Sequence, residues 1–396
     1  MSFQSNRRSF LVASSLTALA SSRAFGANDT LRIGVIGAGG RMKNLLDAAD
    51  KVGLYQIAAV ADVYKPHAEA LRERSGGTAT THLHYQEVFS QDVDAVLIAT
   101  PDHHHVRIAT DALAAHKDVY CEKPVTHTID EGAGLIKAVH ASKQVFQCGM
   151  QQRSWPHFRD AVELVQSGAL GRVVQIRTFW WQNYTPHFSL EPDWTSADRP
   201  LNIEDLDWKL WLGNAPEQPF TKEKYFLWRW FWNFGGGAMT DLFTHWIDIV
   251  HWAMKSDTPK EAFMMGDKFF FDSWDCPDTI QAALRYPGFD VVYEGNMVSS
   301  IDEGGLEFRG TEATLKLNRG GMSLSRERIP GKSNPILSEA SAIDGTTTHM
   351  QNFFDCIKSR KQPNAPVEAG VAAARAGQIA NLAHQNNGHI MWPMKA

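Results

Sequence analysis

Acid and base side chains recur at helical spacing after a run of three glycines. The run Gly235 to Gly237 opens a stretch in which Asp241, His245 and Asp248 follow one another. Residues three and four apart share one face of a helix, where a carboxylate could orient an imidazole and tune its pKa for proton transfer. A solvated polar face would also hold such residues. The glycines weaken a helix start, however, and favour an acid/base site with a flexible approach.

Two loops in the N-terminal third carry further candidate groups. One is Glu122-Lys123-Pro124, directly after an apolar run, and the other contains three consecutive histidines within residues 100–105. A lysine between an apolar strand and a proline is not placed like an ordinary surface lysine. The histidines could bind zinc, but adjacent residues at a helix start point in different directions, and no thiolate or carboxylate has ligand spacing with them. We therefore expect no metal site.

A glycine-rich turn, Gly37-Ala38-Gly39-Gly40-Arg41-Met42, follows the first apolar run. Gly37 allows a tight turn, and Gly39 lets the backbone approach a pyrophosphate at a helix N-terminus. Met42 stands at the third fingerprint position, which is usually glycine. Asp62 ends the second apolar run, where a carboxylate accepts from ribose hydroxyls and repels a 2′-phosphate; a turn or N-cap aspartate is the alternative. The pattern predicts NAD, with NADP less favoured.

The elements that must position these groups alternate over the first 150 residues. Apolar runs separated by amphipathic stretches predict a parallel sheet covered on both faces. In such a sheet ligands bind beyond the carboxyl ends of the strands, where both loops fall. The predicted strands are 31–36, 57–61, 95–99, 119–121 and 145–148, and the predicted helices lie near 40–51, 65–74, 103–116 and 128–143.

After residue 150 the composition becomes aromatic. Nine of the 13 tryptophans lie between Trp155 and Trp232. Most should be core, but some could stack on sugar rings, and the cluster Trp228-Arg229-Trp230-Phe231-Trp232 is best placed to do so. Runs rich in Val, Phe, Tyr and Ile over 259–317 predict an antiparallel sheet, whereas 318–345 reads as a long polar loop. Closing helices are expected over 346–359 and 368–386.

The N-terminus has the pattern of a targeting segment. Arg7 and Arg8 precede an apolar stretch from Leu11 to Ala20, and small residues near Ala24 offer a cleavage site. This order predicts a twin-arginine signal and a periplasmic or otherwise exported protein, with a ragged N-terminus as the alternative.

The four cysteines are too few for a disulfide framework. No later stretch is long enough to form a membrane anchor, and the formal charge of −5 excludes a basic nucleic-acid footprint.

The expected organisation is therefore an α/β protein in four parts. They are a signal segment 1–26, a dinucleotide-binding domain 27–150, a substrate domain 151–345 and C-terminal helices 346–396 that pack back on the core.

Taken together, the glycine turn, Asp62, Glu122-Lys123-Pro124 and the Asp241/His245 helix resemble the Gfo/Idh/MocA oxidoreductase family. The resemblance covers essentially the whole chain after the signal segment. It implies a Rossmann domain followed by an α/β domain with an open, mainly antiparallel sheet, whose face forms the interface of a homodimer or homotetramer. It further implies that Lys123 lies near the nicotinamide and the reacting hydroxyl, that Asp241 and His245 are the acid/base pair, and that Pro124 is often cis.

The residue assignments follow from the motifs and the resemblance together. We expect catalysis by Lys123, Asp241 and His245. The residues expected at the cofactor are Gly37, Gly39, Gly40, Arg41, Met42, Asp62, Thr100, Pro101, His105, Glu122, Lys123 and Gln151. The residues expected at the substrate are His104, Arg153, Trp228, Arg229, Trp232, Asp241 and His245.

The expected function is NAD-dependent oxidation or reduction at a secondary hydroxyl of a sugar, polyol or glycoside, with a retained cofactor. A redox-assisted glycosidase or lyase would use the same core groups, because transient oxidation of a sugar acidifies the neighbouring C–H. A catalytically silent sugar-sensing protein is the third hypothesis, and retention of Lys123, Asp241 and His245 argues against it.

Overall fold

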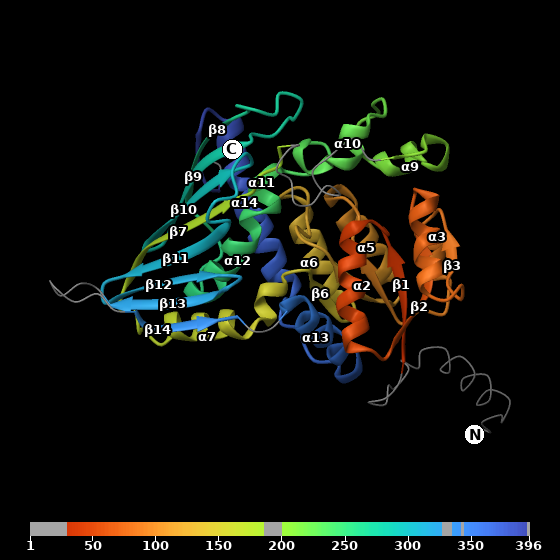
Figure 1. The fold of residues 1–396 in the computed structure, drawn as a ribbon, viewed down its shortest axis with the longest axis horizontal. Helices are drawn as coiled ribbons and strands as arrows, with labels where there is room; N and C mark the ends of the chain where they lie inside the picture. Colours follow the sequence, from red (N-terminus) through yellow and green to blue (C-terminus); the bar gives the residue numbers. More distant parts are fainter. Residues whose placement is uncertain (1–29, 186–199, 327–334, 342–343, 394–396) are drawn as a thin grey trace, which may run out of the picture.

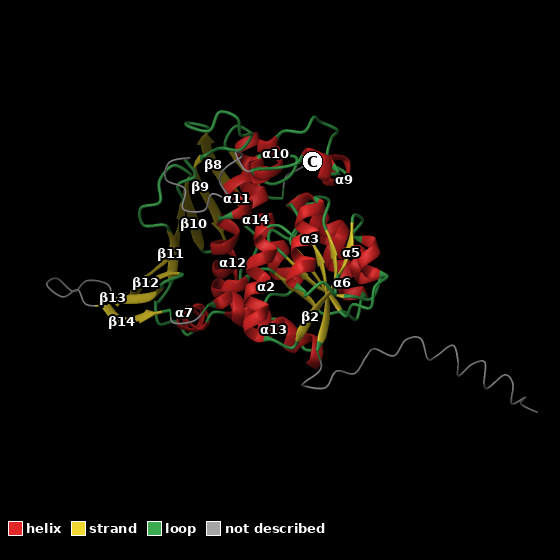
Figure 2. Cartoon of the chain, turned by 45° about the vertical axis from the view of Figure 1, so that its right-hand side comes forward, coloured by secondary structure: helices red, strands yellow, loops and turns green. Residues whose placement is uncertain are grey.

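A computed structural model describes residues 30–185, 200–326, 335–341 and 344–393 (Figure 1). The predicted signal segment lies outside the described residues. Within them, two sheets stand apart with helices between and around them (Figures 1 and 2). The fold class expected from the sequence, a Rossmann domain followed by a mainly antiparallel α/β domain, is confirmed.

The first sheet has six parallel strands in the order β3-β2-β1-β4-β5-β6. β2 lies on one side of β1 and β4 on the other, so the strand order reverses direction between β1 and β4. In such folds ligands bind at the carboxyl ends of the two strands at this switch point. The strands are β1 (Leu31–Ile36), β2 (Tyr55–Ala61), β3 (Thr80–His82), β4 (Ala95–Ile98), β5 (Asp118–Cys121) and β6 (Phe146–Cys148).

Two separate hydrophobic cores cover the faces of this sheet, because successive side chains of a strand point to opposite sides. In β4, Ala95 and Leu97 join the core under α2 and α3, while Val96 and Ile98 join the core under α5 and α6. The helices of this half are α2 (Gly40–Val52), α3 (Lys65–Arg74), α4 (Gln86–Phe89), α5 (His105–Ala114) and α6 (Glu131–Ala141), with a 3₁₀ turn η1 (Asp102–His104) before α5.

The second sheet has nine strands in the order β14-β13-β12-β11-β7-β10-β9-β8-β15, and all pairs are antiparallel except β7 with β10. The strands are β7 (Val173–Trp181), β8 (Glu261–Asp267), β9 (Thr279–Tyr286), β10 (Phe289–Asn296), β11 (Gly304–Gly310), β12 (Ala313–Asn318), β13 (Gly321–Arg326), β14 (Pro335–Ala340) and β15 (His389–Met391).

The expectation of a long loop over 318–345 is wrong, because β13 and β14 fall within it. Met322 and Leu324 are buried, while Ser323 and Ser325 between and after them are more exposed. Two apolar residues among serines and glycines are enough for a half-buried strand. The polar composition hides their period-two alternation.

Helices of the second half lie between the two sheets (Figure 1). They include α12, which packs against β7, and α14, which packs on α12 and β8. The helix α13 contributes Met350, Phe353 and Ile357 to the core shared with α2, so a segment from late in the chain completes the first domain. The remaining elements are η2 (Gln151–Ser154), α7 (Pro156–Gln166), η3 (Ile203–Asp205), α9 (Trp208–Leu212), α10 (Lys222–Phe226), η4 (Trp228–Trp230), α11 (Gly237–Asp241), α12 (Phe243–Met254), α13 (Gly345–Ser359) and α14 (Val367–Gln385).

Candidate active site

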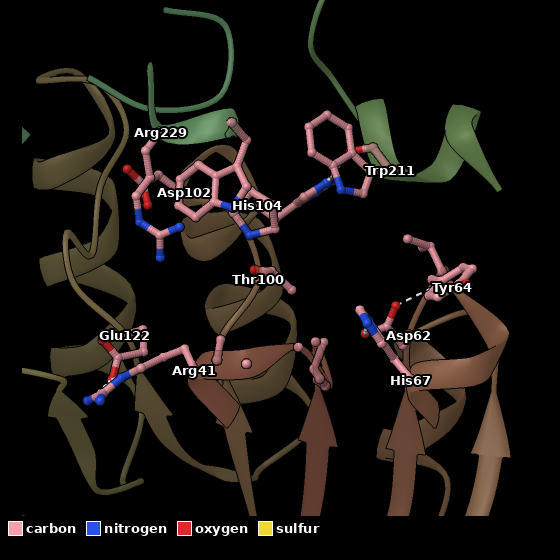
Figure 3. Close-up of a pocket in the computed structure, with 18 of the residues that line it drawn as sticks. Arg41, Asp62, Tyr64, His67, Thr100, Asp102, His104, Glu122, Trp211 and Arg229 are labelled. Carbon is pink, nitrogen blue, oxygen red and sulfur yellow. Dashed lines mark hydrogen bonds and ion pairs between the residues drawn. The ribbon is translucent and has the colours of Figure 1, made fainter. Parts of the chain in front are cut away.

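A cavity of about 1020 Å³ lies beyond the carboxyl ends of β1, β2, β4 and β5. Its floor is formed by the loops that follow these strands, and its roof by residues 200–229 of the second half (Figure 3). A cavity of this size at the switch point of a parallel sheet is the expected place for a ligand as large as a dinucleotide.

The glycine turn at the floor of this cavity fits a pyrophosphate. Gly37 has φ +81°, and a Cβ there would lie 2.9 Å from backbone atoms of Ala99, so only glycine fits between the two strands. Gly39 is the N-cap of α2, has no side-chain cap, and faces open space in the cavity. The first amides of α2 are therefore directed at the cavity without a side-chain acceptor, which suits an anion.

Asp62 joins the glycine turn to the loop after β2. One carboxylate oxygen accepts from Ala38 N at 2.7 Å and the other from Tyr64 N at 2.8 Å, and His67 Nδ1 lies 3.6 Å from the first oxygen. Each carboxylate oxygen can accept a second hydrogen bond, so this residue can hold the turn and still accept from a ribose hydroxyl. Asp62, Tyr64 and His67 all line one end of the cavity (Figure 3).

At the other end, Lys123 is held by Asp241. The Lys123 ammonium donates to the Asp241 carboxylate at 2.5 Å and to the Asp241 carbonyl oxygen at 3.0 Å. Arg229 Nε lies 3.4 Å from the same carboxylate. Burial would raise the pKa of Asp241, but the two cations outweigh it and hold that pKa below its usual value. The Lys123–Pro124 peptide bond is cis, as the resemblance implied.

A break in the predicted helix makes this arrangement possible. The stretch after the glycines forms two helices, α11 and α12, separated at Leu242, in place of one continuous helix. His245 N donates to Leu242 O, so the Asp241 carbonyl is left for Lys123. The predicted contact between Asp241 and His245 is wrong: within the described residues, the ion-pair partners of the Asp241 carboxylate are Lys123 and Arg229.

The glycine run itself is packed and is not a flexible approach to the helix. All three glycines are buried. Gly237 has φ +62°, and a Cβ there would lie 2.7 Å from Cys276 Cβ. The run therefore permits a left-handed turn in a crowded place and fixes the position of Asp241.

His245 lies in the same cavity against an aromatic ring. Its imidazole stacks on Trp180 with ring centroids 5.5 Å apart and an interplanar angle of 25°. Burial, and then the positive charge of Lys123, lower the pKa of His245 well below 6.5. The ring is thus neutral at physiological pH and has a lone pair with which to accept a proton.

Asp102, which sequence reasoning did not single out, also lines the cavity. It is 3% exposed, and its Oδ1 has no hydrogen-bond partner among the residues that the structure describes. Burial, and then the charge of Asp241, raise the pKa of this carboxyl well above 3.8. The raised pKa favours the protonated, uncharged form of this carboxyl. Its position directly after a Thr-Pro loop was the only signal in the sequence.

Most of the predicted site residues converge on this cavity. Those lining it are Gly37, Gly39, Gly40, Arg41, Asp62, Thr100, Pro101, His104, Glu122, Lys123, Gln151, Trp228, Arg229, Asp241 and His245. They come from both halves of the chain, and Figure 3 shows Arg41 beside Glu122 below, with Arg229 and His104 above. Glu122 Oε1 accepts from Arg41 at 2.7 Å, so this pair borders the floor of the cavity.

Four predicted residues do not line the cavity. Met42 is fully buried in the core under α2, because the side chain at the third fingerprint position points into the helix–sheet contact. His105 is buried and bridges two loops, with its ring nitrogens at 2.7 Å from Pro124 O and 2.9 Å from Thr100 O. Met42 and His105 therefore affect the cavity only indirectly, by holding the backbone around it in place.

The other two residues outside the cavity are Arg153 and Trp232. Arg153 forms a buried ion pair with both oxygens of Asp248, at 2.8 and 2.9 Å, and its guanidinium lies 5.1 Å from the Trp252 ring centroid. Asp248 is thus a partner of η2 and does not extend the acid/base pair. Trp232 contributes its carbonyl oxygen to His127, at 2.9 Å.

Sequence reasoning also missed several aromatic and basic residues of the cavity. Trp180 is the penultimate residue of β7, and Arg319 in the turn between β12 and β13 lies 4.8 Å from the Trp180 ring centroid. Trp211 lines the roof. None of these lies in a motif, because they reach the cavity only through the pairing of distant strands and helices.

No group of three or more His, Cys, Asp or Glu side chains in the described ranges is arranged to hold a metal ion. Among these residues, no helix combines the length and apolarity needed to cross a membrane.

The fold and the cavity define a two-domain protein with a Rossmann domain and a cavity at the seam of its domains that is large enough for a dinucleotide. Residues 31–150 match the model of the oxidoreductase family with an NAD-binding Rossmann fold, and residues 215–392 match its C-terminal alpha/beta domain. The chain belongs to this family, the Gfo/Idh/MocA oxidoreductases. A further model of the C-terminal domain matches residues 154–269.

Individual relatives are similar over part of their length. The chain is 29% identical to the rhizopine catabolism protein MocA of Rhizobium meliloti over 47% of this chain and 58% of that protein. It is 32% identical to inositol 2-dehydrogenase of Rhodococcus erythropolis over 37% and 42%, and 29% identical to levoglucosan dehydrogenase of Pseudarthrobacter phenanthrenivorans over 56% and 50%. The chain thus spans about half the length of these curated relatives.

Solved structures share the fold over nearly the whole chain. A levoglucosan dehydrogenase in complex with NADH and levoglucosan superposes with a TM-score of 0.72 at 18% identity, covering 92% of this chain and all of that one. The myo-inositol 2-dehydrogenase of Lactobacillus plantarum gives a TM-score of 0.69 at 18% identity, covering 92% and 99%.

Proposed function

We propose that the protein is an NAD(H)-dependent oxidoreductase that acts on a secondary hydroxyl of a sugar, polyol or glycoside. One observation carries the proposal: the Lys123 ammonium, held on Asp241, lies in the same cavity as His245 and the glycine turn. Relatives with matching segments are inositol and levoglucosan dehydrogenases, which supports a polyhydroxylated substrate.

The proposed chemistry divides between the cofactor and the side chains. Bound NAD supplies a hydride acceptor at its nicotinamide ring. The neutral imidazole of His245 accepts the hydroxyl proton, and the carbon–hydrogen bonding pair leaves as hydride, so that the alcohol becomes a carbonyl. The Lys123 ammonium stabilises the negative charge that develops on the substrate oxygen. Asp241 holds Lys123 in place by its carboxylate and carbonyl.

The cofactor preference rests on Asp62. Its carboxylate lines the cavity at the carboxyl end of β2, beside the glycine turn, where an adenosine ribose would lie. A negative charge at this position accepts from both ribose hydroxyls of NAD and repels a 2′-phosphate. NAD is therefore the proposed cofactor.

The test is to identify the bound dinucleotide and then the reaction. Purified protein is denatured, and the released dinucleotide and its redox state are determined by mass spectrometry and absorbance. The protein is then incubated with polyols, sugars and glycosides while NADH absorbance and product mass are followed. Net NADH formation with a ketone or lactone product is expected. Cleavage of a glycoside without net NADH would instead support the redox-assisted glycosidase or lyase, and no dinucleotide binding at all would overturn the proposal.

Export and assembly are proposed on separate grounds. The twin-arginine pattern at Arg7 and Arg8 supports export in the folded state, with the cofactor already bound. Fusion of residues 1–26 to a reporter that is active only when exported by this route tests it, with Arg7→Lys/Arg8→Lys as control.

A homo-oligomer through the nine-stranded sheet is proposed from the exposed Phe263 and Met265 on β8, which are 40% and 65% exposed. Light scattering of the purified protein tests this assembly.

A further inference from the structure

A segment of the second half crosses the carboxyl edge of the first sheet. This segment, residues Pro200–Gly213, is called the strap here and contains η3 and α9. It is attached to the loop after β2 by a β-bridge between Tyr64 and Leu206, and Asp207 N donates to Val63 O at 2.9 Å. The strap therefore lies against the loop that carries Asp62.

Two histidines of the triple-histidine loop hold the other end of the strap. His103 Nε2 lies 3.1 Å and His104 Nε2 2.7 Å from the carbonyl oxygen of Trp211, and their ring centroids are 4.0 Å apart. Both nitrogens can donate to this one oxygen, because a carbonyl has two lone pairs. The approach is close: a Cβ at Gly213 would lie 2.4 Å from His104 Cε1. We call these two contacts the histidine latch.

The histidine latch is built from uncharged groups. Burial lowers the pKa of His103 well below 6.5 and that of His104 to about 4. Each ring is therefore neutral at pH 7, with its one N–H on Nε2 if it donates to Trp211. This use of the histidines accounts for a motif that has no role in the proposed proton transfer.

The strap forms the wall of the cavity opposite Asp62. Its cavity-lining residues include Leu201, Asp207, Leu210 and Trp211, and Figure 3 shows Trp211 in the roof, above Asp62, Tyr64 and His67. The adenosine end of the cavity is thus enclosed between the first domain, on one side, and a segment of the second domain, on the other.

We propose that the strap is the second wall of the dinucleotide site, fastened by the histidine latch, and that the dinucleotide leaves only when the strap lifts. The proposal rests on the proposed binding of NAD(H). It assigns His103 and His104 to cofactor retention, where the sequence led us to expect substrate contact for His104.

A reversible disulfide tests whether the strap must move. Because Asp207 N donates to Val63 O, Tyr64 and Leu206 form a non-hydrogen-bonded pair, whose Cα atoms lie about 4.5 Å apart. A disulfide spans this separation. The four natural cysteines are all buried and free, so they compete little with the new pair. The variant Tyr64→Cys/Leu206→Cys is loaded with NADH and then oxidised.

The readout is NADH release, measured by the loss of its fluorescence after dilution into excess NAD. Release from the oxidised variant should be much slower than from the same variant in reductant. Equal rates in the two redox states, with the disulfide verified by mass spectrometry, would overturn the proposal. Comparison within one variant removes any effect of losing the Tyr64 ring.

Substitutions in the histidine latch give the opposite change. His103→Phe/His104→Phe keeps two rings and removes two hydrogen bonds, and release should be about 30-fold faster, which corresponds to about 1 kcal/mol for each bond. The matched control is His251→Phe, which removes a buried hydrogen bond to Tyr286 within the second domain. An unchanged release rate in the double variant would contradict the histidine latch. Failure of the wild-type protein to bind NADH at all would instead overturn the proposed function, and this proposal with it.

Discussion

The ammonium of Lys123 is oriented by two oxygens of a single residue, the carboxylate and the carbonyl of Asp241. An ammonium fixed in this way is preorganised to stabilise an alkoxide and requires little rearrangement during the reaction. His245 is held separately, by its stacking on Trp180. The proposed mechanism therefore assigns charge stabilisation and proton transfer to two side chains that are held in place differently.

The first prediction concerns these two side chains. His245→Ala and Lys123→Ala should each lower kcat by about 10²–10⁴-fold, the usual contribution of a positioned acid or base. NADH affinity, measured by fluorescence titration, should change little for His245→Ala because its ring lies at the substrate end. Near-normal kcat in His245→Ala would place the base elsewhere, with Asp241 or Lys123 as the next candidates.

The second prediction uses the buried Asp102. Its pKa is raised above the unfolded value of about 3.9, so the folded protein retains a proton that the unfolded chain loses. The bound proton makes its whole contribution to the free energy of unfolding below about pH 4. This contribution is lost as the pH rises toward the pKa of the folded protein. Asn has no such proton to lose. Asp102→Asn should therefore gain stability relative to wild type as the pH rises above about 4.

Urea unfolding of both proteins at several pH values measures this difference. Asp160→Asn on α7, where the side chain is exposed, is the matched control and should show no such trend. A difference that stays constant with pH would mean that Asp102 is ionised in the folded protein.

Among the elements, the parallel strands were the most predictable part of the fold. β1 has the bounds that the apolar run indicates, and β2, β4, β5 and β6 differ by one or two residues at an end. Such strands are buried on both faces, so their sequences are continuously apolar and are recognised without tertiary information. The short β3 was missed because its three residues, Thr80–His82, are only partly buried.

The site was less predictable, for physical reasons that differ between residues. The glycines and Lys123 could be found because short sequence patterns identify them: a glycine-rich turn after an apolar run, and a lysine between an apolar run and a proline. The helix break at Leu242 has no such mark, since neither glycine nor proline stands there. It coincides with the contact between Asp241 and Lys123, which are 118 residues apart. Trp180 and Arg319 likewise reach the cavity through long-range pairing alone.

The third prediction concerns the ion pair that joins η2 to α12. The side chains of Arg153 and Asp248 are 10% and 2% exposed, so removing one partner leaves a buried charge. Asp248→Ala should lower the free energy of unfolding by about 3–5 kcal/mol. NADH affinity should remain close to wild type, because neither residue lines the cavity.

The control is the exposed pair of Glu69 and Arg72, whose side chains are 36% and 45% exposed. Glu69→Ala should cost about 1 kcal/mol or less. If Asp248→Ala costs no more than Glu69→Ala while weakening catalysis, the pair serves the site and not the fold.

At the scale of the whole molecule, the proposed dinucleotide site is lined by residues of both domains. The fourth prediction is that NAD(H) raises the melting temperature and NADP(H) does so less at equal concentration. A ligand that binds only the folded state stabilises it by about 2.7 kcal/mol at 100 times its Kd. The weaker effect of NADP(H) follows from the Asp62 carboxylate, which would face the 2′-phosphate.

Differential scanning fluorimetry across a concentration series measures both shifts, and calorimetry gives the two affinities. Equal or larger stabilisation by NADP(H) would contradict the assignment of Asp62. In that case Lys65, at the start of α3, is the residue that could supply the countercharge.

The position of the strap limits how the halves of this protein can be exchanged. A chimera that joined residues 30–150 to the second domain of another family member would inherit the glycine turn and Asp62 but would lose Trp211, the acceptor for both His103 and His104. Such a hybrid could carry every residue of the dinucleotide motif and still bind its cofactor only loosely. Tight binding would then be transferred only when the strap and the triple-histidine loop are exchanged as a matched pair.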